Sequence, residues 1–168
     1  MKHLIIWLTL IVYSVAVYGN TYKRYDVRSG LSGNCVRSIV QDSIGYMWFA
    51  TQDGLSRFNG TGFTNYGHSS GNDEYGYINV ISICRHLNNR NIWVADVKTL
   101  YLFDTWQEKF TPFDKKTAEG AHVNSVFCMT YDNAGQLWIG TAGGLFVYNE
   151  AENLLKSYRH NSNNPRSL

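Results

Sequence analysis

The sequence Gly45-Tyr-Met-Trp-Phe-Ala-Thr-Gln-Asp-Gly-Leu-Ser-Arg-Phe-Asn-Gly60 contains two short apolar runs between three turn signals. The first run, Tyr46 to Thr51, is apolar on both pleat faces, as in a strand that is covered on both sides. Asp53-Gly54 offers the positive φ of a tight hairpin, and Leu55 to Phe58 runs back before Asn59-Gly60 turns the chain again. The stretch therefore predicts part of a β-meander.

The same pattern occurs three times along the chain. Trp48, Trp93 and Trp138 stand at a constant interval of 45 residues, and each precedes a bulky apolar residue and a very small one. A repeat of this length is typical of β-propeller blades, in which each unit is a four-stranded sheet. We expect the large tryptophan and the small residue to alternate so that neighbouring blades interdigitate in a core. The strands predicted in the first repeat are Val36–Gln41, Tyr46–Thr51, Leu55–Phe58 and Phe63–Tyr66.

The predicted fold class is all-β: a partial β-propeller of about three four-stranded antiparallel blades plus an N-terminal closing strand. The closing strand is expected because Tyr22 and Tyr25 repeat the spacing of Phe63 and Tyr66. Such a strand would pair with the last blade of the ring and remove two open edges. The expected units are residues 1–19 (signal peptide), 20–33 (closing strand and connector), 34–78 (blade 1), 79–123 (blade 2) and 124–168 (blade 3 and a connector to a missing blade).

The second repeat departs from the other two in its turns. Asp42–Gly45 and Asp132–Gly135 each offer an aspartate that starts a turn and a glycine that ends it. Asn88–Asn91 replaces this pattern in the second repeat, and the turn is expected to survive because asparagine tolerates the left-handed conformation. Asp96–Thr99 lacks the glycine of the next hairpin, so this loop is expected to be the most specialised of the three.

Composition and charge limit the class of protein. The chain has 168 residues, 44% of them hydrophobic, with 15 glycines and only two prolines, which indicates a globular fold rich in turns. A net charge of +2 with scattered Lys and Arg argues against a nucleic-acid surface. Cys35, Cys84 and Cys128 fall in different repeats and are interpreted as small buried hydrophobic residues. No metal site and no cofactor are predicted.

The first nineteen residues resemble a cleavable secretory signal. Lys2 and His3 precede the apolar run Leu4 to Val17, and small or modest residues lead up to Asn20. The run is short for a membrane span, which needs about 20 residues. The sequence therefore predicts an exported protein.

Several stretches closely resemble the opening blades of the two-component regulator propeller family. They are Gly30–Val36, Gln41–Thr51 and Asp53–Gly60; the third repeat, Asp132–Tyr148, fits the same pattern, and His160–Leu168 resembles a connector between blades. The resemblance implies the periplasmic sensor region of a hybrid histidine kinase of the kind typical of Bacteroidetes. It also implies that the membrane span, kinase and output domains belong to a longer protein, so this chain is expected to be a non-catalytic fragment.

In this family the sensor typically recognises oligosaccharides and switches on polysaccharide-utilisation genes, so an oligosaccharide is the expected ligand. A propeller takes four to eight blades, and the remaining blades are expected from a longer chain or from further copies of this one. In a propeller the loops between the second and third strands share one face with the connectors between blades. Sugar binding needs aromatic planes beside carboxylates and amides. The predicted ligand-binding residues are Asp73, Tyr75, Asp96 and Lys98.

Two other functions stay open at this point. The spacing from Asp42 through Gly45 to Trp48 is similar to the turns of sialidase-like propellers, which would make the chain an exported glycan-active enzyme. Hydrolysis requires an acid and a nucleophile at a defined separation, and the repeat singles out no such carboxylate pair, so no catalytic residue is predicted. The third possibility is a propeller that serves only as a scaffold for other proteins.

Overall fold

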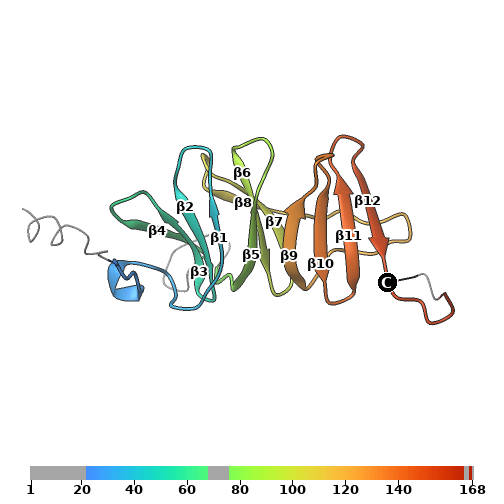
Figure 1. The fold of residues 1–168 in the computed structure, drawn as a ribbon, viewed down its shortest axis with the longest axis horizontal. Coiled ribbons are helices and arrows are strands. Elements are labelled where there is room, and N and C mark those ends of the chain that lie inside the picture. The colour runs from blue at the N-terminus through green and yellow to red at the C-terminus, as the bar shows by residue number, and fades with distance from the viewer. Residues whose placement is uncertain (1–21, 68–75, 165–166, 168) are drawn as a thin grey trace, which may run out of the picture.

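Short apolar runs between turn residues produce short strands throughout the chain. The computed structural model describes residues 22–67, 76–164 and 167, and twelve strands form three four-stranded antiparallel sheets in that part (Figure 1). The predicted all-β class and the partial propeller of three blades are confirmed. The strands are β1 (Val36–Gln41), β2 (Met47–Thr51), β3 (Gly54–Phe58), β4 (Phe63–Tyr66), β5 (Val80–Arg85), β6 (Asn91–Asp96), β7 (Leu100–Asp104), β8 (Lys109–Pro112), β9 (Val126–Tyr131), β10 (Leu137–Thr141), β11 (Gly144–Asn149) and β12 (Leu154–Tyr158).

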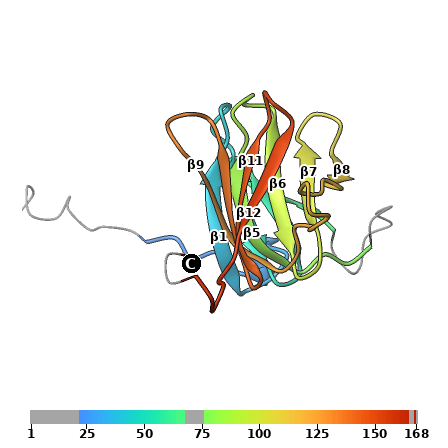
Figure 2. The same cartoon turned by 90° about the vertical axis from the view of Figure 1, so that its right-hand side faces the viewer.

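Each sheet pairs only strands that follow one another in the chain. The strand orders are β1-β2-β3-β4, β5-β6-β7-β8 and β9-β10-β11-β12. The first strands of the three sheets lie next to one another, β1 beside β5 and β5 beside β9. The view of Figure 2 shows the sheets one behind another. This arrangement places the first strand of each blade nearest a common axis and the fourth strand at the periphery.

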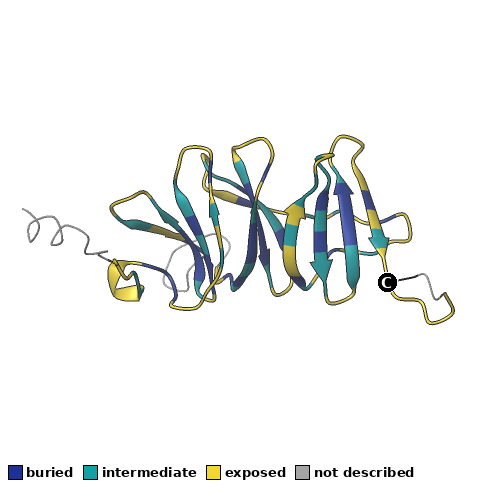
Figure 3. Ribbon diagram, in the orientation of Figure 1, coloured by how far each residue is buried: buried dark blue, intermediate teal, exposed yellow. Residues whose placement is uncertain are grey.

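Two interfaces between blades hold the apolar core, and we call them the first seam (blades 1 and 2) and the second seam (blades 2 and 3). Figure 3 shows buried positions along the strands and exposed positions at the loops. Trp48 is 0% exposed in the first seam, where its ring lies 5.5 Å from that of Phe103. Trp93 is buried in the second seam against Phe113. Trp138 is only half buried, because no further sheet covers that side of blade 3 in the described part of the chain.

A single aspartate joins the first turn of blade 1 to its core tryptophan. The Oδ1 atom of Asp42 accepts the N–H groups of Ile44 at 3.0 Å and Tyr46 at 2.9 Å. Its Oδ2 atom accepts the indole N–H of Trp48 at 2.8 Å. Blade 3 repeats this geometry, since the indole of Trp138 donates to its own turn aspartate at 2.8 Å. The six-residue spacing of aspartate and tryptophan thus has a structural reason in both blades.

The turn of blade 2 begins at His86, and the prediction that it begins at Asn88 is wrong. The N–H of His86 donates to the carbonyl of Asn91 at 3.0 Å, which is the place that Asp42 takes in blade 1. Asn89 has a φ of 59°, so the expected left-handed asparagine is present. Compared with blade 1, blade 2 has one residue fewer between its repeated asparagine, Asn79, and Ser82. It has one residue more in the turn that follows. The two changes cancel, so the tryptophan interval stays constant.

The expected closing strand is not formed among the described residues. Residues 22–26 are irregular and lead into the 3-10 turn Val27–Ser29, which Asp26 caps. A strand requires a partner strand, and the three sheets pair only their own strands. The ring of Tyr25 nevertheless packs on Phe58 at 4.9 Å, much as Tyr66 packs on Phe103 at 5.1 Å. The segment therefore places an aromatic ring on blade 1 where a preceding blade would place one.

Replacing Tyr25 with alanine should lower the free energy of unfolding by about 1 kcal/mol, because it removes two aromatic pairs. Tyr22, whose side chain is 92% exposed, provides the matched control, and Tyr22→Ala should have no measurable effect. Urea denaturation of the two variants makes the comparison. Equal effects would contradict a packing role for Tyr25.

Candidate functional site

The face that carries the β2–β3 and β6–β7 loops contains two of the four predicted ligand-binding residues. Asp96 ends β6, and its Oδ1 atom accepts the N–H of Lys98 at 2.7 Å and the N–H of Thr99. This carboxylate closes the turn, which explains how the loop forms without glycine. The Lys98 side chain is exposed. Asp73 and Tyr75 lie outside the described residues.

An exposed aromatic residue on the same face was missed from the sequence. Tyr77 is 51% exposed and donates its hydroxyl hydrogen bond to the carbonyl of Gln52 in the β2–β3 loop, at 2.6 Å. Tyr77 lies three residues before Val80, and Val80 pairs with Asp96. The loop face thus offers an aromatic ring and two charged side chains from adjacent parts of blades 1 and 2. Its position between two blades was the sequence signal that could have identified Tyr77 as a loop-face residue.

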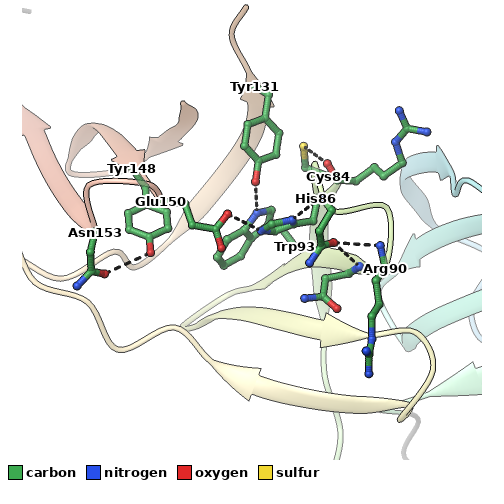
Figure 4. Close-up of polar contacts among 11 residues, drawn as sticks. Cys84, His86, Arg90, Trp93, Tyr131, Tyr148, Glu150 and Asn153 are labelled. Atoms are coloured by element: carbon green, nitrogen blue, oxygen red, sulfur yellow. Dashed lines mark hydrogen bonds and ion pairs between the residues drawn. The ribbon is translucent and has the colours of Figure 1, made fainter. Parts of the chain in front are cut away.

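A second polar cluster lies inside the second seam, around His86 (Figure 4). The His86 side chain is 3% exposed, and its Nδ1 atom accepts the N–H of Asn88 at 3.1 Å. Its Nε2 atom lies 3.0 Å from the Oε2 atom of Glu150, in the β11–β12 turn of blade 3. The distance suits an ion pair, but the Nε2 atom has no well-directed hydrogen bond. The imidazole ring also packs on the indole of Trp93, with centroids 5.6 Å apart.

The indole of Trp93 binds across the seam instead of within its own blade. Its N–H donates to the hydroxyl of Tyr131 at 2.8 Å, whereas the tryptophans of blades 1 and 3 donate to their own turn aspartates. Burial raises the pKa of Tyr131 to about 12; the bond from Trp93 opposes this rise, and the charge of Glu150 adds to it. In blade 2, His86 takes the place of this aspartate. The indole of Trp93 therefore forms its hydrogen bond with blade 3 and not within its own blade.

Replacing Tyr131 with phenylalanine should lower the free energy of unfolding by about 1–3 kcal/mol, because the buried indole N–H of Trp93 loses its acceptor. Because the pKa of Tyr131 is raised, its contribution to the free energy of unfolding should depend on pH. The stabilisation by neutral Tyr131 is fully present below about pH 10, the pKa of an unfolded tyrosine. It is lost as the pH rises toward 12. Urea denaturation from pH 7 to pH 11.5 should show a steeper alkaline loss in the parent chain than in Tyr131→Phe, and parallel curves would contradict the assignment.

The first seam also holds a carboxylate from the following blade. Glu108 accepts a hydrogen bond from the Tyr66 hydroxyl at 2.7 Å and lies 3.2 Å from the guanidinium of Arg57. That guanidinium lies over the Trp48 ring at 5.7 Å. Burial and the hydrogen bond to Glu108 both raise the pKa of Tyr66. Each seam therefore combines a tryptophan with an acidic side chain from the next blade.

The three cysteines correct an expectation. Cys35 and Cys128 are exposed and are not small core residues, whereas Cys84 is half buried and packs against the core of the second seam. Cys35 precedes β1, and the other two lie in β5 and β9, the strands nearest the axis. Within the described ranges no group of three or more His, Cys, Asp or Glu side chains is placed to hold a metal ion. Nor does the described part contain a helix that is long and apolar enough to cross a membrane.

Comparison with known proteins relates these blades to signalling proteins. The family model described as "Two component regulator propeller" matches residues 30–53, which contain β1 and β2 of blade 1, and residues 121–143, which contain β9 and β10 of blade 3. This finding confirms the predicted resemblance, which was based on overlapping stretches of blades 1 and 3. No curated protein matches the sequence of the chain.

Two solved structures of B. thetaiotaomicron proteins resemble the chain. Both are described as extracellular domains of hybrid two component systems. The first is 25% identical with a TM-score of 0.66, and covers 86% of this chain and 19% of its own. The second is 26% identical with a TM-score of 0.69, and covers 82% of this chain and 20% of its own. The chain thus spans about a fifth of the length of either domain.

Proposed function

We propose, starting from the regulator propeller matches in blades 1 and 3, that this chain is part of the ligand-sensing propeller of a hybrid two-component system. The observation that carries the proposal is the similarity to two extracellular domains of such systems over more than four fifths of this chain. The proposed location is outside the cytoplasm, in the periplasm. The remaining blades come from a longer chain or from further copies.

The proposed ligand is an oligosaccharide that binds on the loop face. Tyr77 offers an aromatic ring there, Lys98 an exposed ammonium group, and Asp96 a carboxylate with one oxygen used by its turn. Sugars bind where an aromatic plane lies beside polar groups that satisfy their hydroxyls. The proposed outcome of binding is the regulation of polysaccharide-utilisation genes through the rest of the signalling protein.

The geometry favours binding over hydrolysis. Both oxygens of Asp42 are occupied by its own turn and by Trp48. Asp132 is occupied in the same way, and the hydrogen bond from Trp138 is the main cause of its lowered pKa. A glycosidase needs one carboxyl group that holds a proton and a second at a defined distance. The aspartates that resemble those of sialidase-like propellers thus serve the fold.

Calorimetric titration of the extracellular domain that contains this chain, with a panel of oligosaccharides, tests the proposal. Lys98→Ala removes the exposed ammonium group and should weaken binding at least fivefold. Asp96→Asn keeps an oxygen that can close the turn while removing the charge, so it separates ligand contact from loop structure. Lys156→Ala, at an exposed position of β12, is the matched control and should leave affinity unchanged.

Three results would overturn the proposal. Unchanged affinity after alanine replacement of Asp73, Tyr75, Asp96 and Lys98 together would exclude this site. Release of reducing sugar during the titration would indicate a glycan-active enzyme. Capture of a protein partner with no sugar binding at all would indicate a scaffold.

A further inference from the structure

The two nitrogens of His86 have partners in different blades. Nδ1 accepts the N–H of Asn88 in its own turn at 3.1 Å, so this nitrogen carries no proton. The single proton of the neutral ring is therefore on Nε2, which lies 3.0 Å from the Glu150 carboxylate of blade 3. The geometry alone fixes the tautomer.

The other titratable groups of the cluster around His86 stay neutral where an imidazole titrates. They are Tyr131 at the end of β9, Tyr148 in β11 and Cys84 in β5. Burial raises the pKa of each of these three groups, to about 12 for Tyr131. An imidazole gains its second proton near pH 6.5 in the absence of other influences. Within the described part of the chain, the Glu150 carboxylate, 3.0 Å from Nε2, is thus the acidic group that faces the ring once it is charged.

We propose that protonation of His86 exchanges a hydrogen bond inside blade 2 for a charge pair between blades 2 and 3. A proton taken from solvent binds at Nδ1, the nitrogen that carries no proton in the neutral ring. Nδ1–H and the N–H of Asn88 are then both donors, so their hydrogen bond is lost. The positive ring then attracts the Glu150 carboxylate, which lies 3.0 Å from Nε2.

The turn that would change is bound to blade 1 and to another loop of blade 2. The Asn89 carbonyl accepts the hydroxyl of Ser43, in the turn of blade 1, at 2.9 Å. The Arg90 carbonyl accepts the N–H of Thr105, beyond β7, at 3.2 Å. A change in residues 86–91 therefore reaches the first seam as well as the second. Mildly acidic pH would thus change the contacts in both seams.

Blade 3 provides an internal control with a corresponding hydrogen bond at the start of its turn. The N–H of Ala134 donates to Oδ1 of Asp132 at 2.9 Å, as the N–H of Asn88 donates to His86. The indole of Trp138 lowers the pKa of Asp132, so this carboxylate stays charged between pH 5.5 and pH 7.5. The Ala134 amide should therefore behave alike at both pH values.

Amide hydrogen exchange followed by NMR on the full chain tests the proposal. After correction for the intrinsic pH dependence of exchange, the protection of the Asn88 amide should fall at least tenfold from pH 7.5 to pH 5.5. That of Ala134 should not change. In His86→Asn the Oδ1 atom can accept from Asn88 and does not titrate, so protection should be equal at both pH values. Glu150→Gln should move the loss of protection to lower pH.

The carbon chemical shifts of the His86 ring report its protonation in the same samples. The unmodified chain alone can therefore show whether protonation of the ring and loss of Asn88 protection occur together. A ring that gains its proton while the Asn88 amide keeps its protection would overturn the proposal. So would a ring that stays neutral down to pH 5.5. Because no ligand is present in this experiment, its failure would leave the proposed sensing function untouched.

Discussion

Replacing Trp48 with alanine should lower the free energy of unfolding by about 3–5 kcal/mol, the usual cost of deleting a large buried aromatic side chain. The indole is fully buried in the first seam, against Tyr66 of its own blade and Phe103 of the next. The substitution also leaves one oxygen of Asp42 without its donor. Urea denaturation followed by far-ultraviolet circular dichroism measures the loss.

Trp138→Ala is the matched control for this prediction. Trp138 has the same place in its blade and the same bond to a turn aspartate, but its outer side is not covered by a further sheet. We expect a loss of only about 1–2 kcal/mol, as for a partly buried apolar side chain. The difference between the two variants measures packing between blades. Equal losses would contradict the conclusion that the tryptophan stabilises the seam.

Replacing Gly54 with alanine should be nearly as damaging, at about 3 kcal/mol or more. The residue has a φ of 126°, and an added Cβ would lie 2.8 Å from the carbonyl oxygen of Tyr66. The variant thus combines backbone strain of about 1–3 kcal/mol with a collision against the backbone of β4. Thermal unfolding would show the effect directly.

Gly60→Ala separates the two contributions. Gly60 has a φ of 97°, but no atom lies within 4 Å of the position that its Cβ would take. Its substitution should therefore cost only the conformational strain, about 1–2 kcal/mol. If both variants lose the same stability, the close approach of β3 and β4 does not require glycine.

Regular features of the repeat could be predicted from the sequence. The strands Val36–Gln41 and Phe63–Tyr66 have the predicted bounds, and Leu55–Phe58 differs by one residue. These strands are set by local signals, namely apolar runs and turn residues. The burial of Trp48 and Trp93 also followed from the pattern, because a strand that is apolar on both faces requires a cover on both sides.

The polar cluster of the second seam could not be predicted in the same way. The constant tryptophan interval concealed a deletion and an insertion that cancel, so the place of His86 in the turn was assigned to other residues. The contact of Trp93 with Tyr131 depends on how two sheets meet, about which a repeat period says nothing. The exposure of Cys35 and Cys128 has the same origin, because a sequence pattern does not show which strand is nearest the axis.

The pairing of strands only with their immediate neighbours has a consequence for how the protein assembles. Contacts of short sequence separation form quickly, since little chain entropy is lost in closing each loop. We expect each meander to collapse as a separate unit soon after synthesis, and the docking of one finished unit on the next to limit the overall rate. Stability should then grow stepwise with every unit added, as in a linear array whose members interact only with their nearest neighbours.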